Sequence, residues 1–482
     1  MSLRSSSRVG SRFTRSSRLD RFRSRTGAAA ARYRLRDLAG LRRPATLVVL
    51  AFAAMVAFGT VLLLLPAATE SGESAGFVTA LFTSTSAVCV TGLIVVDTPV
   101  YWSTFGEVVI LGLVQIGGFG IMSLATVLTL VVTRRIRLRM QITAGTETKS
   151  VTIGDVRQLV SGILRVTLIF EAAVCAVLTL RLWAGYGESI GHAAYLGLFH
   201  SVSAFNNAGF ALYSDSLQGF ATDPWITVPV SVAVIAGGLG FPVWVELWRH
   251  ARRRKEPHSW TLHAKITLAT TGVLLAVGWV AFVVLEWRNP ATMGPLSVGD
   301  KVLTGWFQAV MPRTAGFESL PFGEMNTQTL LMTDMLMFIG GGSAGTAGGI
   351  KVTTFALLAF VIYANVRGEA TVHVGNRRLA AGVAQQAITV ALLAIGLVFS
   401  ATMALMVITP FTLDEILFET TSAFSTVGLS TGITGDLGTM GELIIIALMF
   451  IGRLGPITLA SALALRRHVR RFELPEERPI VG

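Results

Sequence analysis

Hydrophobic residues in this chain form long runs, and the runs occur in pairs. A helix that crosses the hydrocarbon core of a membrane needs about 20 mostly apolar residues. Eight segments of at least this length can be delimited: 45–66, 104–132, 160–183, 225–248, 264–286, 326–363, 383–409 and 441–466. The hydrophobic pattern therefore predicts eight transmembrane helices, arranged as four pairs.

Between the two runs of each pair lies a shorter segment of mixed polarity that leads to a glycine. These segments span 81–93, 198–210, 306–317 and 417–429, and their glycines are Gly92, Gly209, Gly316 and Gly428. The glycines recur with a period of roughly 110 residues, which indicates internal repeats. Each segment is too short and too polar to cross a membrane. It is expected to form a re-entrant half-helix followed by a loop, because protein or water must satisfy irregular backbone at membrane depth.

The fold predicted from this pattern is an all-α polytopic membrane protein. Four pseudo-repeated units, each a span, a pore helix, a filter loop and a span, are expected to surround one pore. The predicted divisions are a basic tail and four pore units, at 1–43, 44–140, 141–255, 256–375 and 376–482. We refer to the last four as units 1 to 4.

Composition supports a membrane protein and argues against an enzyme. Hydrophobic residues make up 52% of the chain, charged residues 14%, and the mean hydropathy is +0.63. A soluble domain of this size is less apolar. The two cysteines, Cys89 and Cys175, give no disulfide framework. The sequence offers no metal-ligand spacing, nucleotide-binding glycine loop or nucleophile triad.

Positive charge is concentrated at the amino terminus. The net charge is +12, and residues 1–43 alone carry thirteen arginines and two aspartates. The high pI therefore reflects a basic tail rather than a nucleic-acid-binding body. We interpret the tail as a disordered cytoplasmic arm that touches anionic membrane lipid. A transit peptide and a docking segment for a cytoplasmic partner remain alternative interpretations.

Charges elsewhere in the chain predict the orientation in the membrane. Lysines and arginines crowd the joints between units, for example at 134–139, 249–255 and 466–471. Acidic residues lie near the re-entrant segments instead, among them Glu70, Asp97, Asp215, Glu318 and Asp436. The positive-inside rule then places both termini in the cytoplasm and the re-entrant loops toward the outside.

The glycine segments have the chemistry of a cation filter. Backbone carbonyls replace the water shell of a cation without adding a net charge that would trap it. Glycine allows the unusual backbone angles that aim successive carbonyls inward, and each half-helix directs the negative end of its dipole toward the cation. The candidate ion-binding residues are Val90, Thr91, Gly92, Asn207, Ala208, Gly209, Thr314, Ala315, Gly316, Thr426, Val427 and Gly428. Helix-packing glycines are the competing explanation. Asn206 and Asn207 could place amides at the filter mouth or cap the half-helix.

A charged residue interrupts the second span of unit 4. Gly118, Gly238, Gly341 and Arg453 follow their filter glycines by 26, 29, 25 and 25 residues. Charged residues inside spans are costly and usually face a cavity. We predict that Arg453 lies under the filter and forms an electrostatic barrier to cations. The alternative is that Arg453 pairs with a buried carboxylate, for which Glu171 is the candidate.

The second span of unit 3 is too long to cross the membrane as one straight helix, which predicts a break in it. As one helix, 326–363 would be roughly 57 Å long, against a hydrocarbon core of about 30 Å. Residues 340–349 include six glycines, which weaken a helix. We predict a gating loop formed by Gly340, Gly341, Gly342, Ser343, Gly345, Thr346, Gly348, Gly349 and Lys351, with Lys351 restarting the helix. A static packing kink is the alternative.

Together these features resemble the Trk/Ktr/HKT superfamily of potassium-uptake proteins. The most specific matches are 206–210, 313–317 and 340–351, and the resemblance extends from about residue 45 to 470. Eight spans without an extra amino-terminal hairpin are closer to the Ktr type. Glycine at all four filter positions resembles the K⁺-selective members, whereas sodium-selective plant relatives tend to have serine in the first. Pro312 departs from the hydroxyl residue expected there and puts the local geometry of the pore helix in doubt.

The resemblance implies a K⁺-translocating subunit of the cytoplasmic membrane, in a homodimer whose protomers each hold a pore. It also implies regulation by a separate cytoplasmic RCK-type nucleotide-binding subunit. We predict gated K⁺ permeation driven by the membrane potential, with Na⁺ as a possible coupling or activating ion, and no nucleic-acid partner. The alternatives are a Na⁺-permeable relative and an alternating-access K⁺/Na⁺ or K⁺/H⁺ symporter. Parallel units, which each begin and end inside, favour a pore over the inverted repeats common in symporters.

Overall fold

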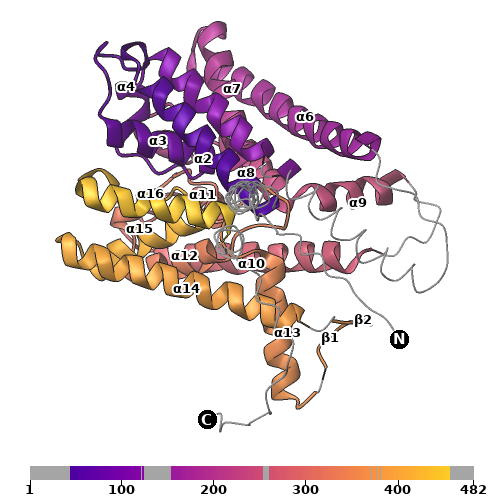
Figure 1. Ribbon diagram of the computed structural model, residues 1–482. Helices are drawn as coiled ribbons and strands as arrows, with labels where there is room; N and C mark the ends of the chain where they lie inside the picture. The colour runs from indigo at the N-terminus through magenta and orange to yellow at the C-terminus, as the bar shows by residue number, and fades with distance from the viewer. Residues whose placement is uncertain are drawn as a thin grey trace, which may run out of the picture. The chain divides into compact units, whose positions relative to one another are not determined.

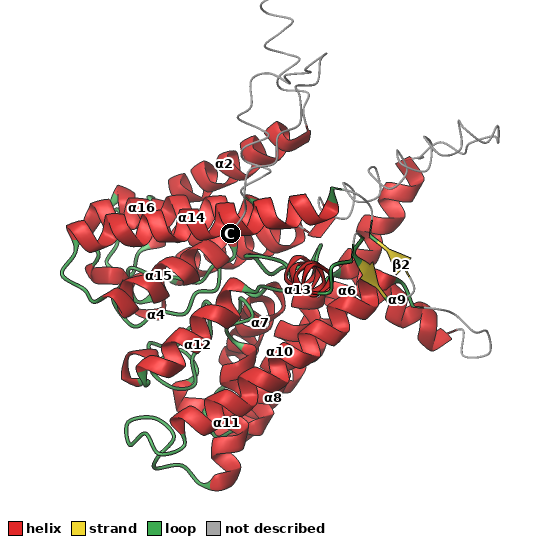
Figure 2. Ribbon diagram, turned by 90° about the horizontal axis from the view of Figure 1, so that it is seen from below, coloured by secondary structure: helices red, strands yellow, loops and turns green. Residues whose placement is uncertain are grey.

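The computed structural model describes residues 44–120, 122–123, 153–252, 260–369, 371–375, 377–379 and 382–455. Residues 52–457 form one compact body, and the second body contributes only residues 44–51 to the description. The predicted basic tail, the joint at 134–139 and the carboxyl-terminal end lie outside the described residues. The described part is mostly helical, with loops between the helices (Figure 2), which agrees with the helical class predicted apart from one short hairpin. One hairpin of two-residue strands, β1 (His373–Val374) and β2 (Arg377–Arg378), is antiparallel.

Four long apolar helices occupy the positions predicted for the first span of each unit. They are α2 (Pro44–Leu63), α6 (Ile153–Tyr186), α10 (Leu262–Glu286) and α14 (Val383–Ile408). Each is long and apolar enough to cross a membrane. Many of their apolar side chains are exposed, and Val284 and Val407 have exposed fractions of 67% and 81%. Such faces suit contact with lipid chains rather than water.

The second spans are less regular than the first. Unit 1 has a helix at Thr104–Gly120, and unit 4 has α16 (Gly438–Leu454); the remainder of both predicted spans lies outside the described residues. In unit 3, α12 (Thr327–Phe338) and α13 (Val352–Val366) are separated by residues 339–351, where a break was predicted. Within the described ranges, four helices meet the criterion for a span, or five if one bent pair is counted. Eight crossings therefore remain a prediction.

The span predicted at 225–248 is not one straight helix in the structure. The structure has α8 (Pro224–Leu239) and α9 (Phe241–Arg252), bent by 102° at Gly240. Gly240 has φ +87°, which a helix cannot contain. The backbone groups freed by the bend bond to residues 339–351: Gly342 N–H donates to Gly238 O at 2.8 Å, and Thr346 N–H to Gly237 O at 3.2 Å. The bend is therefore stabilised by a segment about 100 residues away in sequence.

Four short helices precede the glycine segments, at the positions predicted for re-entrant helices. They are α3 (Phe77–Cys89), α7 (Ile190–Asn206), α11 (Val298–Val310) and α15 (Leu413–Ser425). Polar residues cap three of them: Ser189 and Ser297 accept from backbone N–H groups of the first turn, and Thr412 forms a capping box with Glu415. We call these four the short helices.

The units pack in a cyclic order. The second span of one unit contacts the short helix of the next: α8 packs on α11, α12 on α15, and α16 on α3. The helix Thr104–Gly120 joins α7 in the same way, because Tyr195 Oη donates to Glu107 Oε2 at 2.5 Å. Within unit 4, α14, α15 and α16 lie side by side (Figure 1).

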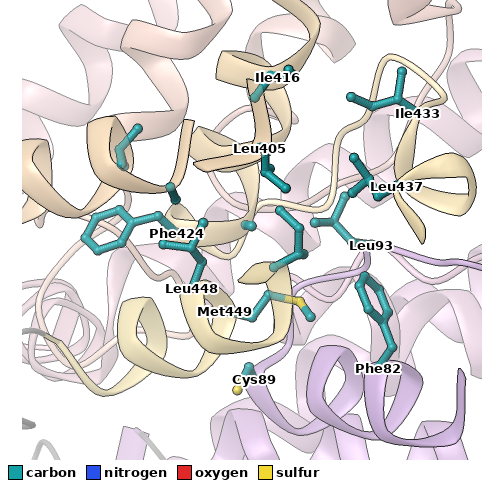
Figure 3. Close-up of a cluster of buried hydrophobic side chains, with 14 of the residues drawn as sticks. Phe82, Cys89, Leu93, Leu405, Ile416, Phe424, Ile433, Leu437, Leu448 and Met449 are labelled. Atoms are coloured by element: carbon teal, nitrogen blue, oxygen red, sulfur yellow. The ribbon is translucent and has the colours of Figure 1, made fainter. Parts of the chain in front are cut away.

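Buried apolar side chains seal the contact between units 4 and 1. Phe82 and Cys89 of α3 meet Leu448 and Met449 of α16, together with Phe424 of α15 (Figure 3). All five are 4% exposed or less. Because α3 and α16 are separated by more than three hundred residues of sequence, this cluster closes the circle of units by hydrophobic burial.

The remaining described elements are short. They are the helix α4 (Thr98–Tyr101) and four 3₁₀ turns: η1 (Pro66–Ala68), η2 (Gln218–Phe220), η3 (Phe322–Glu324) and η4 (Thr434–Asp436).

Candidate functional site

The four glycine segments share one backbone conformation. We call residues 90–92, 207–209, 314–316 and 426–428 turns 1 to 4. Each turn begins with a non-glycine residue at positive φ: 55° for Val90, 60° for Asn207, 68° for Thr314 and 51° for Thr426. Each ends with a glycine at positive φ, namely 94° for Gly92, 71° for Gly209, 74° for Gly316 and 95° for Gly428. Non-glycine residues rarely adopt this conformation, so its fourfold occurrence indicates a common structural requirement.

Hydrogen bonds to the end of the short helix hold this conformation in place. In turn 1, Val90 N–H donates to Ala87 O at 3.1 Å and Thr91 N–H to Ser86 O at 2.8 Å. Turns 2 and 4 repeat both bonds, as is common at helix carboxyl ends. In turn 3, Ala315 N–H donates instead to Met311 O at 3.0 Å. Pro312 therefore alters how the helix ends, while the φ angles of the turn stay within the range of the others.

The four turns meet in a closed ring. A Cβ atom built on Gly92 would lie 3.0 Å from the Cα of Gly209, and one on Gly209 would lie 2.9 Å from the Cα of Gly316. The same construction on Gly316 gives 3.1 Å to Gly428, and on Gly428 gives 3.1 Å to Gly92. At these separations an added side chain would force the neighbouring turn to shift by a few tenths of an ångström or more. Glycine is required at all four positions both by backbone angle and by space.

A backbone carbonyl oxygen lies at each contact between neighbouring turns of this ring. The Cβ built on Gly209 would lie 2.9 Å from Ala315 O, and the one built on each other glycine would overlap the carbonyl oxygen preceding the glycine of the next turn. Those oxygens belong to Thr91, Ala208 and Val427. Each turn therefore contributes one uncharged carbonyl oxygen to the ring, and carbonyl oxygens are the ligands that can replace the water shell of a cation.

A serine six residues before the glycine supports turns 1, 2 and 4. Ser86 Oγ accepts from Gly92 N–H at 3.0 Å, and Ser422 Oγ accepts from Gly428 N–H at 3.1 Å. Ser203 Oγ donates to Phe210 O at 2.7 Å, and the equivalent residue of unit 3 is Val310. Sequence reasoning missed these serines. Their recurrence at one spacing in three of the four segments was the available signal.

A cavity of about 610 Å³ opens on one side of the ring. The four glycines and the residues that follow them line this cavity, which we call the vestibule. It is acidic, because Asp97, Asp215, Glu318 and Glu324 contribute to its wall. Glu318 also accepts from Ser430 N–H at 3.5 Å. Burial, with the neighbouring Glu419 carboxylate adding to it, raises the pKa of Glu318 to about 8.

Residues 339–351, which we call the glycine loop, contact the residues that precede the glycines. Thr346 Oγ1 lies 2.8 Å from the side-chain amide of Asn207 in turn 2. Arg313, next to turn 3, donates from Nη2 to Gly340 O at 2.9 Å. Gly348 packs so closely on turn 4 that an added Cβ would overlap Thr426 Oγ1. The glycine loop thus touches turns 2 and 4 and the residue directly before turn 3, and it is absent from the wall of the vestibule.

Arg453 and Lys351 hold the middle of the glycine loop. Arg453 Nη1 donates to Thr346 O, and Lys351 Nζ donates to Ala347 O. Arg453 is 5% exposed, and its Nε and Nη2 atoms have no partner among the described residues. The structure therefore brings together the residues predicted as a barrier and as a gate. Lys351 is the N-cap of α13, so the helix restarts where the sequence predicted.

The alternative pairing of Arg453 with Glu171 is wrong. Glu171 accepts from Gln115 Nε2 at 3.3 Å and from Asn206 Nδ2 at 3.1 Å. These amides satisfy the carboxylate without an arginine, which instead bonds to the glycine loop. Neither asparagine reaches the vestibule, since Asn206 points to this cluster and Asn207 ends α7 and contacts Thr346.

The second-span glycines let the spans approach the short helices. A Cβ on Gly117, Gly237 or Gly452 would overlap the carbonyl oxygen four residues before the glycine of turn 1, 2 or 4, respectively. Gly118, Gly238 and Arg453 follow these three glycines directly. The predicted equivalence of those positions therefore has a structural counterpart in three units.

Comparison with known proteins agrees with this architecture. Residues 40–468 match the family TrkH, described as a cation transport protein. The chain is 39% identical to Ktr system potassium uptake protein B of Bacillus subtilis over 421 residues, covering 87% of this chain and 93% of that protein. It is 35% identical over 445 residues to the potassium/sodium uptake protein NtpJ of Enterococcus hirae, covering 91% and 97%.

A solved structure has the same fold. The potassium transporter TrkH from Vibrio parahaemolyticus superimposes with a TM-score of 0.70 at 19% identity, covering 86% of this chain and 84% of that one. These relatives are transport proteins, which confirms the expectation of a transporter rather than an enzyme. The chain belongs to the TrkH family of cation transport proteins and is a multi-pass membrane protein.

Proposed function

We propose that this protein conducts K⁺ across the cytoplasmic membrane through a filter formed by turns 1 to 4. The closed ring of four glycines, with a backbone carbonyl oxygen at each contact between turns, carries this proposal. The oxygens of Thr91, Ala208, Ala315 and Val427 replace part of the water shell of the ion. The names of the relatives, which specify potassium or potassium and sodium, support K⁺ as the main ion and Na⁺ as a competing, coupling or activating ion.

The vestibule is the outer mouth in this proposal. Its carboxylates raise the local cation concentration before the filter. The short helices α3, α7 and α15 end at the turns, so the negative ends of their dipoles point to the ion. Both termini then lie in the cytoplasm, and the four predicted units surround the pore.

The glycine loop is the proposed gate, and it lies on the inner side of the filter. Its residues contact the turns before their glycines, whereas the vestibule lies beyond them. Arg453 adds a positive charge next to the loop and opposes the passage of cations when the loop is closed. The glycines of the loop allow its backbone to rearrange, because they carry no side chain that restricts φ and ψ.

The quaternary arrangement is also a proposal. We propose a homodimer and a separate RCK-type nucleotide-binding subunit on the cytoplasmic side, as the resemblance to Ktr-type proteins implies; the names of two relatives describe protein B of a Ktr system, which supports the presence of a further component. This subunit would act on the gate from the cytoplasm. Membrane lipid is the remaining partner, and we propose no nucleic-acid ligand.

Ion flux into vesicles tests this function. Purified protein is reconstituted in liposomes that contain KCl, and the uptake of radiolabelled Rb⁺ is followed with external K⁺ or Na⁺ as competitor. A K⁺-selective pore takes up Rb⁺ without a Na⁺ or H⁺ gradient, and K⁺ competes far better than Na⁺. Uptake that requires either gradient would support a symporter instead, and equal competition by Na⁺ would indicate a Na⁺-permeable relative.

A loop deletion tests the gate separately. Removing Gly342 to Gly345 shortens the glycine loop at its tip, and Rb⁺ should then enter faster without any regulator. Unchanged or slower uptake by a folded deletion variant would contradict gating by the loop. The result would leave the filter proposal intact, because the deleted residues are outside turns 1 to 4.

A further inference from the structure

Arg313 is a buried cation that neither the filter nor the barrier explains. It lies directly before turn 3 and is 6% exposed. Its Nη2 atom donates to Gly340 O at 2.9 Å, whereas Nε and Nη1 have no partner among the described residues. Burying a guanidinium without a carboxylate is costly. A residue that only filled space here would be apolar, so the single bond to Gly340 requires an explanation.

The bonded carbonyl lies at the neck of the glycine loop. Gly340 N–H donates to Ile350 O at 2.8 Å, and Ile350 N–H donates to Phe338 O at 3.2 Å. These bonds draw the two ends of the loop together between α12 and α13. Arg313 therefore bonds to the loop at the place where its two ends meet, between α12 and α13. Arg453 and Lys351 hold residues 346 and 347, nearer the middle of the loop.

The position of this arginine among the units is specific. The residue three before the glycine is Cys89 in unit 1, Asn206 in unit 2 and Ser425 in unit 4, and none carries a charge. Unit 3 has the arginine, and unit 3 also supplies the glycine loop. The charged group and the loop that it holds thus belong to the same unit. Among the described residues, turn 2 bonds to the loop through the neutral side chain of Asn207, and a charged residue makes such a bond only beside turn 3.

We propose that Arg313 is a positioning residue that couples turn 3 to the glycine loop, so that the conformation of the filter and the state of the gate depend on each other. This inference rests on the proposed function. Thr314, the next residue, has φ +68° and begins the turn. A rotation of turn 3 moves the Arg313 backbone and pulls on Gly340, and displacement of the loop neck acts on turn 3 by the same path.

A double-mutant cycle tests the coupling. The variants are Arg313→Gln, the deletion of Gly342 to Gly345, and both together, measured by Rb⁺ uptake into liposomes. Loss of a charged hydrogen bond that favours the closed loop should raise basal uptake roughly tenfold. In the deletion background, Arg313→Gln should add no further increase, because the loop that it releases is already open. Arg313→Lys keeps the charge with a different reach and should give an intermediate uptake.

The control is Arg181→Gln. Arg181 Nε bonds to Asp223 at 2.7 Å, its side chain is 39% exposed, and it touches neither a turn nor the glycine loop. This variant should leave uptake unchanged. If Arg313→Gln does not elute as folded protein on size exclusion, Arg313→Lys carries the same cycle.

The outcomes separate this inference from the proposed gate. Uptake that increases in the deletion variant but stays at the wild-type rate in the Arg313 variants contradicts the coupling and leaves the gate in place. Independent, multiplicative effects in the double variant also contradict it, since Arg313 would then act through something other than the loop. If the deletion itself does not raise uptake, the gate is wrong and the coupling falls with it.

Discussion

Gly209→Ala is the sharpest perturbation that the ring of turns offers, because Gly72 provides a matched control. The two glycines have nearly the same backbone angle, φ +71° and +72°. A Cβ on Gly209 would lie 2.9 Å from both Ala315 O and the Cα of Gly316, whereas a Cβ on Gly72 would have nothing within 4 Å. The pair therefore separates crowding in the ring from the cost of the backbone angle.

The expected magnitude follows from these distances. Alanine at either site pays about 1–2 kcal/mol for the left-handed conformation. At Gly209 the new methyl must also reach an ordinary separation of about 3.5 Å, which pushes turn 3 outward by roughly 0.6 Å. A binding constellation tolerates displacements of about 0.5 Å. We therefore expect the preference for K⁺ over Na⁺ to fall about tenfold, equivalent to ~1.4 kcal/mol, in Gly209→Ala alone.

The assay is competition of K⁺ and Na⁺ against Rb⁺ uptake in liposomes, with thermal unfolding measured on the same preparations. Gly72→Ala should lose a little stability and keep its selectivity. The reasoning would be refuted by a folded Gly209→Ala protein with wild-type selectivity. It would also fail if Gly72→Ala lost as much selectivity, because backbone strain alone would then account for the effect.

Three further predictions concern charged side chains. Arg453→Gln removes the charge that bonds to Thr346 and should raise basal Rb⁺ uptake roughly tenfold; uptake at or below the wild-type rate would argue against a barrier. Because burial and a neighbouring carboxylate raise the pKa of Glu318 to about 8, this group gains negative charge as the external pH rises from 7 to 9. Uptake at low K⁺ should increase over that range, and Glu318→Gln should abolish the increase; a variant with the wild-type pH profile would exclude this group. Glu171→Leu leaves Gln115 Nε2 without its acceptor, whereas Asn206 Nδ2 keeps Gln115 Oε1 at 2.7 Å and Val202 O at 2.9 Å, so the change should cost about 1–3 kcal/mol. Thermal unfolding measures that loss, and an unchanged melting temperature would show that the cluster is not stabilising.

The first spans and short helices were predictable because lipid imposes a strict local rule. Every backbone group inside a membrane must be satisfied within its own segment, so a span appears in the sequence as a continuous apolar run. The first residue of α14, Val383, and the last residue of α10, Glu286, are those given by the pattern. The glycines of turns 1 to 4 were predictable for a similar reason, because a turn that needs positive φ favours glycine, and such turns recur at similar intervals.

The bend at Gly240 and the partner of Arg453 were not predictable from local pattern. Residues 225–248 are apolar enough for one straight helix, and the bend occurs because the glycine loop of another unit bonds to Gly237 and Gly238. Arg453 likewise had two candidate environments, and only the packed structure shows that its nitrogen reaches Thr346 while amides surround Glu171. Both outcomes depend on contacts between units, which periodicity cannot encode.

The sequence by itself determined the helical segments, their fourfold recurrence and the positions where glycine must stand, because each of these depends on the polarity or backbone freedom of neighbouring residues. The tertiary structure alone decided that the four turns close into a ring and that a loop from unit 3 touches two of them and the residue before a third. Closure depends on burial between helices far apart in the chain, such as α3 against α16. That free energy arises only when all the units are assembled.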